Sequence, residues 1–205
     1  PAEKIIFDKK KNMPNLYIIS GCNGAGKTTA SFTVLPEILN CQEFINADEI
    51  ARGLSPFNPD KAAIKAGRIM LSRIDEFISM EHDFAFETTL STKSYLHTIE
   101  KAKRRGYEVT LLFFWLDSVE LAIERVKTRV AEGGHDIPES VIRRRYFSGV
   151  RNLFHIYLPV SDYWMITNNS SPNLELIAEG NYNAVTKVEN SFIFDHIKEL
   201  SHGDK

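Results

Sequence analysis

The stretch "SGCNGAGKTT", residues 20–29, constrains the fold of this chain more than any other. It fits the pattern G-x-x-x-x-G-K-[ST], in which a glycine-rich turn joins a strand to a helix and binds phosphate. "NLYIIS" before it predicts a short buried strand, and "KTTASFTVLPEIL" predicts a helix from Lys27 to about Leu39. Backbone N–H groups at such a helix N-terminus attract anions, with the Lys27 ammonium on the β- and γ-phosphates and the Thr28 hydroxyl on Mg²⁺. The motif therefore predicts a nucleotide site made by Gly21, Asn23, Gly24, Ala25, Gly26, Lys27, Thr28 and Thr29.

Apolar segments of strand length alternate with helical patterns along the rest of the chain. Strands are predicted at residues 16–20, 43–48, 83–89, 107–117 and 162–168, and helices at 58–80, 92–106, 118–133 and 137–160. The helix at 58–80 carries an apolar stripe of Ile64, Ile69, Met70, Ile74, Phe77 and Ile78. This order predicts an α/β three-layer sandwich, with a mostly parallel five-stranded sheet and helices on both faces. In such sheets ligands bind beyond the carboxyl ends of the strands, so the residues directly after each strand are the candidates.

Composition narrows the class of protein and its partners. With 205 residues, 43% of them hydrophobic and 25% charged, the chain is long enough for one well-buried globular domain. A net charge of −2 gives no electrostatic reason to expect nucleic acid as a partner. No leader peptide or bilayer-length apolar run is visible, so no membrane partner is expected. A disulfide between Cys22 and Cys41 would block the phosphate site, which predicts reduced thiols and a cytoplasmic location.

Two acidic residues follow the second and third predicted strands. Asp48 stands where a carboxylate could accept the proton of a substrate hydroxyl, or could cap a short helix. Arg52, one helical turn later, could bind a substrate anion or pair with Asp48. Glu87 ends the apolar run "DFAF" and either binds substrate hydroxyls, together with Thr89, or holds Mg²⁺ through water. After the fourth strand, Asp117 resembles a metal-binding position, but "LDS" is better explained as the start of a helix capped by Ser118.

Arginines crowd the two helices that flank the turn at residues 133–134, namely Arg125, Arg129, Arg143, Arg144 and Arg145. Such a hairpin can act as a lid that neutralises a transferring phosphoryl group, or the run can be a solvated face. We expect Arg129 and at least one of Arg143 and Arg144 to face the cleft, with Arg145 turned elsewhere. His135 is ranked below them because an imidazole supplies less charge. After the last strand, Asn169 lies in a polar loop that either edges an adenine ring or is a simple turn.

Taken together, "SGCNGAGKTT", "INADEIA", "FAFETTL", "RVAEGGHDIPESVIRRRY" and "TNNSS" resemble the zeta toxin family of P-loop kinases, and most closely its chromosomal branch. The resemblance covers about residues 15–180 and implies a P-loop kinase-like fold with a helical lid. It implies Lys27 as the P-loop lysine, Asp48 as the base, and Arg129 as the first lid arginine. It also implies Glu87 and Thr89 as substrate contacts. One departure is His135, which stands before Pro138 where the family has a second lid arginine, so either His135 or an arginine of the next helix substitutes.

The resemblance implies an Mg²⁺- and ATP-dependent kinase that phosphorylates a hydroxyl of a small molecule. The expected acceptor is a UDP-sugar such as UDP-N-acetylglucosamine, and a separate antitoxin protein is an expected partner. The alternatives are a housekeeping nucleoside or sugar kinase and a non-kinase P-loop ATPase module. We expect a single domain over residues 1–205, with the lid at about 129–146 and a C-terminal extension at about 181–205.

Overall fold

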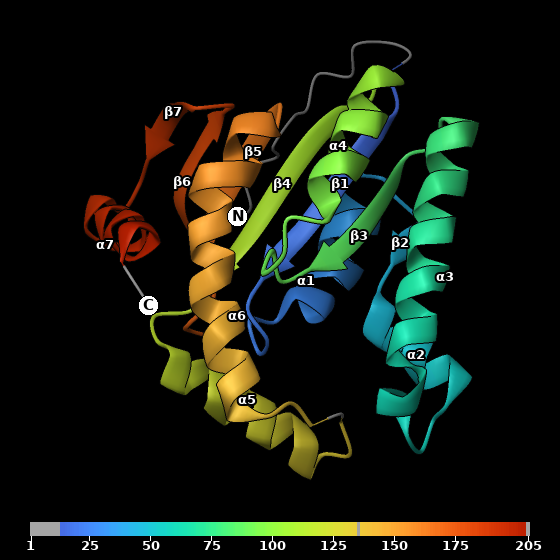
Figure 1. The fold of residues 1–205 in the computed structure, drawn as a ribbon. Coiled ribbons are helices and arrows are strands. Elements are labelled where there is room, and N and C mark those ends of the chain that lie inside the picture. Colours follow the sequence, from blue (N-terminus) through green and yellow to red (C-terminus); the bar gives the residue numbers. More distant parts are fainter. Residues whose placement is uncertain (1–12, 135, 204–205) are drawn as a thin grey trace.

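The computed structural model describes residues 13–134 and 136–203, and its centre is a seven-stranded sheet in the order β2-β3-β1-β4-β5-β6-β7 (Figure 1). The first five strands in the chain are parallel, as predicted: β1 (Asn15–Gly21), β2 (Phe44–Ile45), β3 (Phe84–Thr88), β4 (Glu108–Trp115) and β5 (Tyr163–Asn168). The sheet then continues with two antiparallel strands, β6 (Glu175–Asn181) and β7 (Ala184–Val188). The α/β class is confirmed, and the C-terminal segment adds two strands to the five that were predicted.

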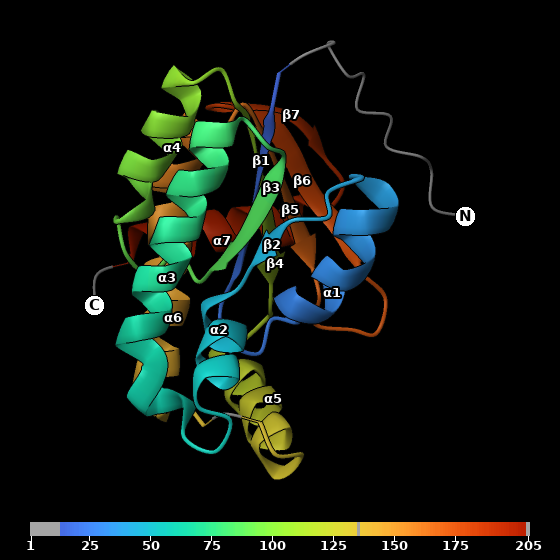
Figure 2. The same cartoon turned by 90° about the vertical axis from the view of Figure 1, so that its right-hand side faces the viewer.

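Helices cover both faces of this sheet, which makes three layers (Figure 2). The short helix α1 (Lys27–Thr33) and its π-helical extension η1 (Val34–Ile38) lie on one face, opposite α3 (Pro59–Met80), α4 (Tyr95–Arg104) and α6 (Glu139–Asn152). Two helices lie near the carboxyl ends of the parallel strands, α2 (Ala47–Leu54) and α5 (Val119–Ala131). The chain leaves α6 through η2 (Leu153–Tyr157) and η3 (Leu158–Val160), and α7 (Ser191–His202) packs against α6 and β6.

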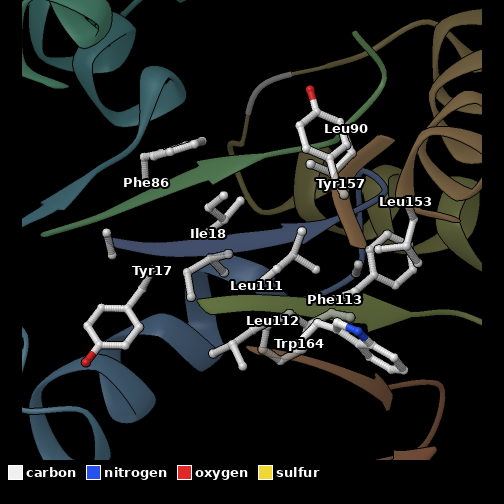
Figure 3. Packing of buried hydrophobic residues seen from close by; sticks show 14 of the residues in the cluster. Tyr17, Ile18, Phe86, Leu90, Leu111, Leu112, Phe113, Leu153, Tyr157 and Trp164 are labelled. Carbon is white, nitrogen blue, oxygen red and sulfur yellow. The ribbon is translucent and has the colours of Figure 1, made fainter. Parts of the chain in front are cut away.

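The core follows the alternation of side chains along β1 and its neighbours. Ile18 is paired in register with Phe86 of β3 and Leu111 of β4, and these three side chains share one face of the sheet. Figure 3 shows Tyr17 on the opposite side of β1 from Ile18. Every residue of β4 from Val109 to Trp115 is buried. This burial on both faces explains why the strand is apolar at every one of these positions except Thr110.

The predicted stripe of α3 is wrong at one end. Ile64 is 76% exposed, whereas the N-terminal half of the helix is buried through Ala62 and Ala66. These alanines pack against Ala51 of α2, and Ile64 lies on another side of the helix. The two helices therefore pack closely through small residues at this contact. Hydrophobicity alone favoured the larger side chain of Ile64, which lies outside the contact.

Within the described residues, 13–134 and 136–203, no helix has the length and apolar character that a bilayer span requires. Both cysteines are buried and free, as expected from the sequence. The thiol of Cys22 lies inside the P-loop, where burial raises its pKa to about 11.

Candidate active site

The glycine-rich loop has the backbone conformation that its sequence predicts. Gly21 and Gly26 both have positive φ, 144° and 75°. A Cβ atom at Gly21 would lie 2.5 Å from the Phe114 carbonyl oxygen, and one at Gly26 would lie 2.5 Å from Asn169 Nδ2. The positive φ favours glycine at both positions, and at Gly21 the close backbone of β4 leaves no room for a side chain.

Four polar side chains meet at the start of α1. Lys27 Nζ donates to the Cys22 carbonyl oxygen at 2.9 Å and lies 3.5 Å from Glu87 Oε1. The hydroxyl of Thr28 donates to Glu87 Oε2 at 2.7 Å, and Asn46 Nδ2 donates to the same oxygen at 2.8 Å. The side chains of Lys27 and Glu87 are only 6% and 12% exposed, so this is a nearly buried ion pair with two further hydrogen bonds.

This cluster is suited to hold Mg²⁺ beside a nucleotide. Thr28 and Glu87 offer a hydroxyl and a carboxylate oxygen, and Mg²⁺ is typically bound through one or two such groups plus substrate phosphates and water. No group of three or more His, Cys, Asp or Glu side chains that could hold a metal by themselves occurs in the described part of the chain. The Mg²⁺ site would therefore need phosphate oxygens of the nucleotide as ligands in addition to Thr28 and Glu87. The ion would supply charge neutralisation of the phosphates when bound.

Asp48 lies in the first turn of α2, because β2 ends at Ile45 and not at residue 48 as predicted. The helix is capped by Asn46, whose Oδ1 accepts hydrogen bonds from the backbone N–H groups of Asp48 and Glu49. The side chain of Asp48 is therefore not the cap that sequence reasoning left open as an alternative. Asn46 was missed as a site residue, although an Asn before "ADE" is a recognisable capping signal.

Asp48 and Thr28 open onto one cavity of about 240 Å³. Arg52 and Arg129 also line it, so four residues predicted from the sequence meet here. Arg52 pairs with Glu49, three residues before it on α2, at 3.6 Å and not with Asp48 as one expectation had it. The remaining lining residues are Asn46, Ala47, Glu49, Ala51, Pro59, Asp60 and Ala63.

The three consecutive arginines of α6 point in different directions, and the expectation for Arg145 is wrong. Arg143 donates to Glu120 of α5 at 2.8 Å on the exposed outer side of the helix pair. Arg145 was expected to turn elsewhere, but its Nη1 donates to Asn23 Oδ1 of the P-loop at 3.2 Å. Arg144 is exposed. The helical period explains why Arg143 and Arg145 point apart, since a rotation of 100° per residue places them on nearly opposite sides of α6.

Asn169 contacts the P-loop through its side chain. Its Nδ2 donates to the Ala25 carbonyl oxygen at 2.8 Å. The loop is held by Arg125, which donates to the carbonyl oxygens of Asn169 and Ser170 at 2.8 and 3.0 Å. Arg125 is thus not a lid arginine but a clamp on this loop, a role that no sequence signal indicated.

Thr29 is exposed in the first turn of α1. The hydroxyl of Thr89 shares a hydrogen bond of 2.9 Å with Ser91 Oγ, and neither Thr89 nor Glu87 is among the described residues that line the cavity. Ser118 caps α5 as predicted, because its Oγ accepts a hydrogen bond from the Leu121 backbone N–H. His135 lies outside the described residues.

Comparison with known proteins identifies the family. The family model described as "Zeta toxin" matches residues 3–157, about three quarters of the chain. The chain belongs to the zeta toxin family of P-loop kinases. An uncharacterized protein of Haemophilus influenzae is 35% identical to it over 126 residues, which cover 62% of this chain and 88% of that protein.

Two solved structures share the fold. The AvrRxo1-ORF1:AvrRxo1-ORF2 complex with ATP matches with a TM-score of 0.71 and 15% identity over 95% of this chain. This zeta toxin family member spans 66% of the length of that matched chain. The PezAT chromosomal toxin–antitoxin system of Streptococcus pneumoniae matches with a TM-score of 0.65 and 19% identity, over 98% of this chain and 84% of that one.

Proposed function

We propose that this protein transfers the γ-phosphoryl group of ATP, with Mg²⁺, to a hydroxyl of a small molecule. One observation carries the proposal: Thr28 of the P-loop and Asp48 open onto the same cavity. A phosphate donor held at Lys27 and Thr28 would present its terminal phosphorus to an acceptor lying beside Asp48. A relative of the same fold, the AvrRxo1-ORF1:AvrRxo1-ORF2 complex, has been solved with ATP, which supports ATP as the donor.

The reaction assigns one role to each group. The acceptor hydroxyl oxygen attacks the γ-phosphorus and gives its proton to the Asp48 carboxylate, while the bond to the β-phosphate oxygen breaks and ADP leaves. Lys27 and Arg129 stabilise the negative charge on the transferring group. Arg129 lines the same cavity as Thr28, from the last turn of α5.

We infer that the acceptor is a UDP-sugar such as UDP-N-acetylglucosamine, which is the acceptor that the resemblance of the sequence motifs to zeta toxins implies. An acceptor of this kind carries a diphosphate, and Arg52 supplies a cation at the cavity wall. We also propose that a separate antitoxin protein binds this chain, since PezAT is a toxin–antitoxin system of the same fold.

The test is incubation of the protein with Mg²⁺-ATP and a panel of UDP-sugars, nucleosides and free sugars, followed by mass spectrometry of the products. We expect one UDP-sugar to gain a single phosphate and ADP to accumulate in step. A phosphorylated nucleoside or free sugar would replace the proposed acceptor by that of a housekeeping kinase. ATP hydrolysis with no phosphorylated acceptor in the panel would contradict the proposal.

Glu87→Gln should act on the donor side of the reaction. Because Glu87 contacts Thr28 and Lys27 and does not line the cavity, we expect the KM for Mg²⁺-ATP to rise more than the KM for the acceptor. Steady-state kinetics with each substrate varied in turn gives both constants. The opposite ranking would restore the substrate-binding role that the sequence suggested, and Glu49→Gln serves as a control acid on the cavity wall.

A further inference from the structure

The guanidinium of Arg145 lies at the P-loop, in a place that the lid hypothesis does not explain. Arg145 is half-buried, and it donates to Asn23 Oδ1 at 3.2 Å. Asn23 is buried and follows Cys22, whose carbonyl oxygen accepts the hydrogen bond from Lys27 Nζ. The guanidinium of Arg145 and the ammonium of Lys27 therefore contact adjacent residues of the same turn.

The helix that carries Arg145, α6, is fixed to the sheet. The position of Arg145 at the P-loop therefore does not depend on closure of a lid. Tyr146, the next residue, is buried and donates through its hydroxyl to the Leu116 carbonyl oxygen at 2.7 Å. Further along α6, a Cβ atom at Gly149 would lie 2.6 Å from the Thr89 carbonyl oxygen, and Asn152 Nδ2 donates to the Leu90 carbonyl oxygen at 2.7 Å. These contacts hold α6 against the ends of β3 and β4.

Most of the hydrogen-bonding capacity of Arg145 is unused. A guanidinium has five N–H donors, and the described residues accept a hydrogen bond from Arg145 only at Asn23. No carboxylate in that part of the chain pairs with it within 4.0 Å. Burial lowers the pKa of Arg145, and the neighbouring Asp48 carboxylate opposes that shift. A half-buried cation with free donors beside a phosphate loop is suited to an anionic ligand.

We propose that Arg145 binds the γ-phosphate of ATP and replaces the second lid arginine that the chain lacks. The proposal rests on the proposed function in taking ATP as the phosphate donor. Lys27 serves the β- and γ-phosphates from one side of the turn, and the planar fork of Arg145 binds the terminal phosphate from the Asn23 side. Arg143 is excluded from this role by its pairing with Glu120 on the outer surface.

The test compares the affinities for ATP and ADP, measured by calorimetric titration of the full chain without any acceptor. Arg145→Ala should weaken ATP binding by about tenfold to a hundredfold, the range for a hydrogen-bonded charge, and should leave ADP affinity within about threefold. Arg143→Ala is the matched control and should change neither affinity. Arg145→Lys should recover part of the loss, because it returns the charge without the fork.

An equal loss for ATP and ADP would overturn the proposal, because it would mean that Arg145 only shapes the P-loop through Asn23. Unchanged ATP affinity would overturn it as well. If Arg145→Ala fails to fold, Arg145→Gln is measured instead, because its amide retains a donor for Asn23. A selective loss of ATP affinity over ADP affinity in this variant would support the proposal, and an equal loss would overturn it. A wild-type protein that binds ATP but phosphorylates no acceptor would contradict the proposed function alone, and one that binds no ATP would contradict both.

Discussion

Lys27→Ala should lower ATP turnover by at least ~100-fold, the loss expected when a charged donor to the reacting phosphates is removed. Lys27 Nζ lies beside the Cys22 carbonyl oxygen and Glu87, at the centre of the polar cluster on α1. No other lysine contributes to this cluster among the described residues, so the lost charge is not replaced. The rate of ADP formation under saturating ATP is the measurement.

The control for this variant must separate loss of chemistry from loss of fold. Lys27 is buried, and its removal leaves the Glu87 carboxylate with only the hydrogen bonds from Thr28 and Asn46. Some loss of stability is expected, so thermal unfolding is measured alongside, with Lys27→Met as a second variant that retains the aliphatic stem. Lys101→Ala removes an exposed lysine that pairs with Asp75 at 2.7 Å and should leave turnover unchanged. A folded Lys27→Ala protein with wild-type turnover would show that the loop does not bind the reacting nucleotide.

The phosphate loop could be predicted from the sequence because its geometry is local. Positive φ at Gly21, Gly24 and Gly26 follows from residue type, and the helix begins at Lys27 where the motif places it. The parallel strands were also predictable, since their continuous apolar character reflects burial on both faces. The antiparallel strands β6 and β7 were not, because β7 is exposed throughout and so lacks the apolar pattern that marks a buried strand.

The directions of the arginines could not be predicted from the sequence in the same way. Which side of α6 faces the P-loop depends on the anchors Tyr146, Gly149 and Asn152, whose partners are backbone carbonyl groups far away in the chain. Three consecutive residues span about 200° of the helix surface, so the three arginines cannot all face the same way. Long-range packing decides which of them faces the P-loop. The clamp made by Arg125 on Asn169 has the same origin, since it joins α5 to the loop after β5.

The role of Asn46 shows how a local signal can be assigned to the wrong neighbour. A strand that reached residue 48 would make Asp48 the residue directly before the helix, and therefore its cap. In the structure the strand is two residues long, and the helix begins earlier, at Ala47. Asn46 is therefore the cap, and Asp48 lines the cavity.

Asp48→Asn should reduce phosphoryl transfer to the acceptor by ~100-fold or more, the scale of general base catalysis, while ATP binding is retained. An amide has nearly the shape of the carboxylate but does not accept the proton of the acceptor hydroxyl. Because Asn46 caps α2, the substitution should cost the helix only the interaction of one first-turn charge with its dipole, about 0.3–1 kcal/mol. Transfer is measured with the acceptor identified by mass spectrometry, and ATP affinity by calorimetry.

Glu49→Gln is the matched control, because Glu49 is the next acid in the same first turn of α2 and also lines the cavity. Glu49→Gln removes the same charge from the N-terminus of α2 as Asp48→Asn does. Any change in helix stability or in nucleotide affinity that comes only from this charge therefore appears in both variants. Only Asp48→Asn should lose transfer, since Glu49 is already paired with Arg52 at 3.6 Å. Comparable losses in the two variants would mean that Asp48 acts through the charge of the cavity wall. Full transfer by Asp48→Asn would remove the base from the mechanism, and the proton would then have to leave to solvent or to the phosphate itself.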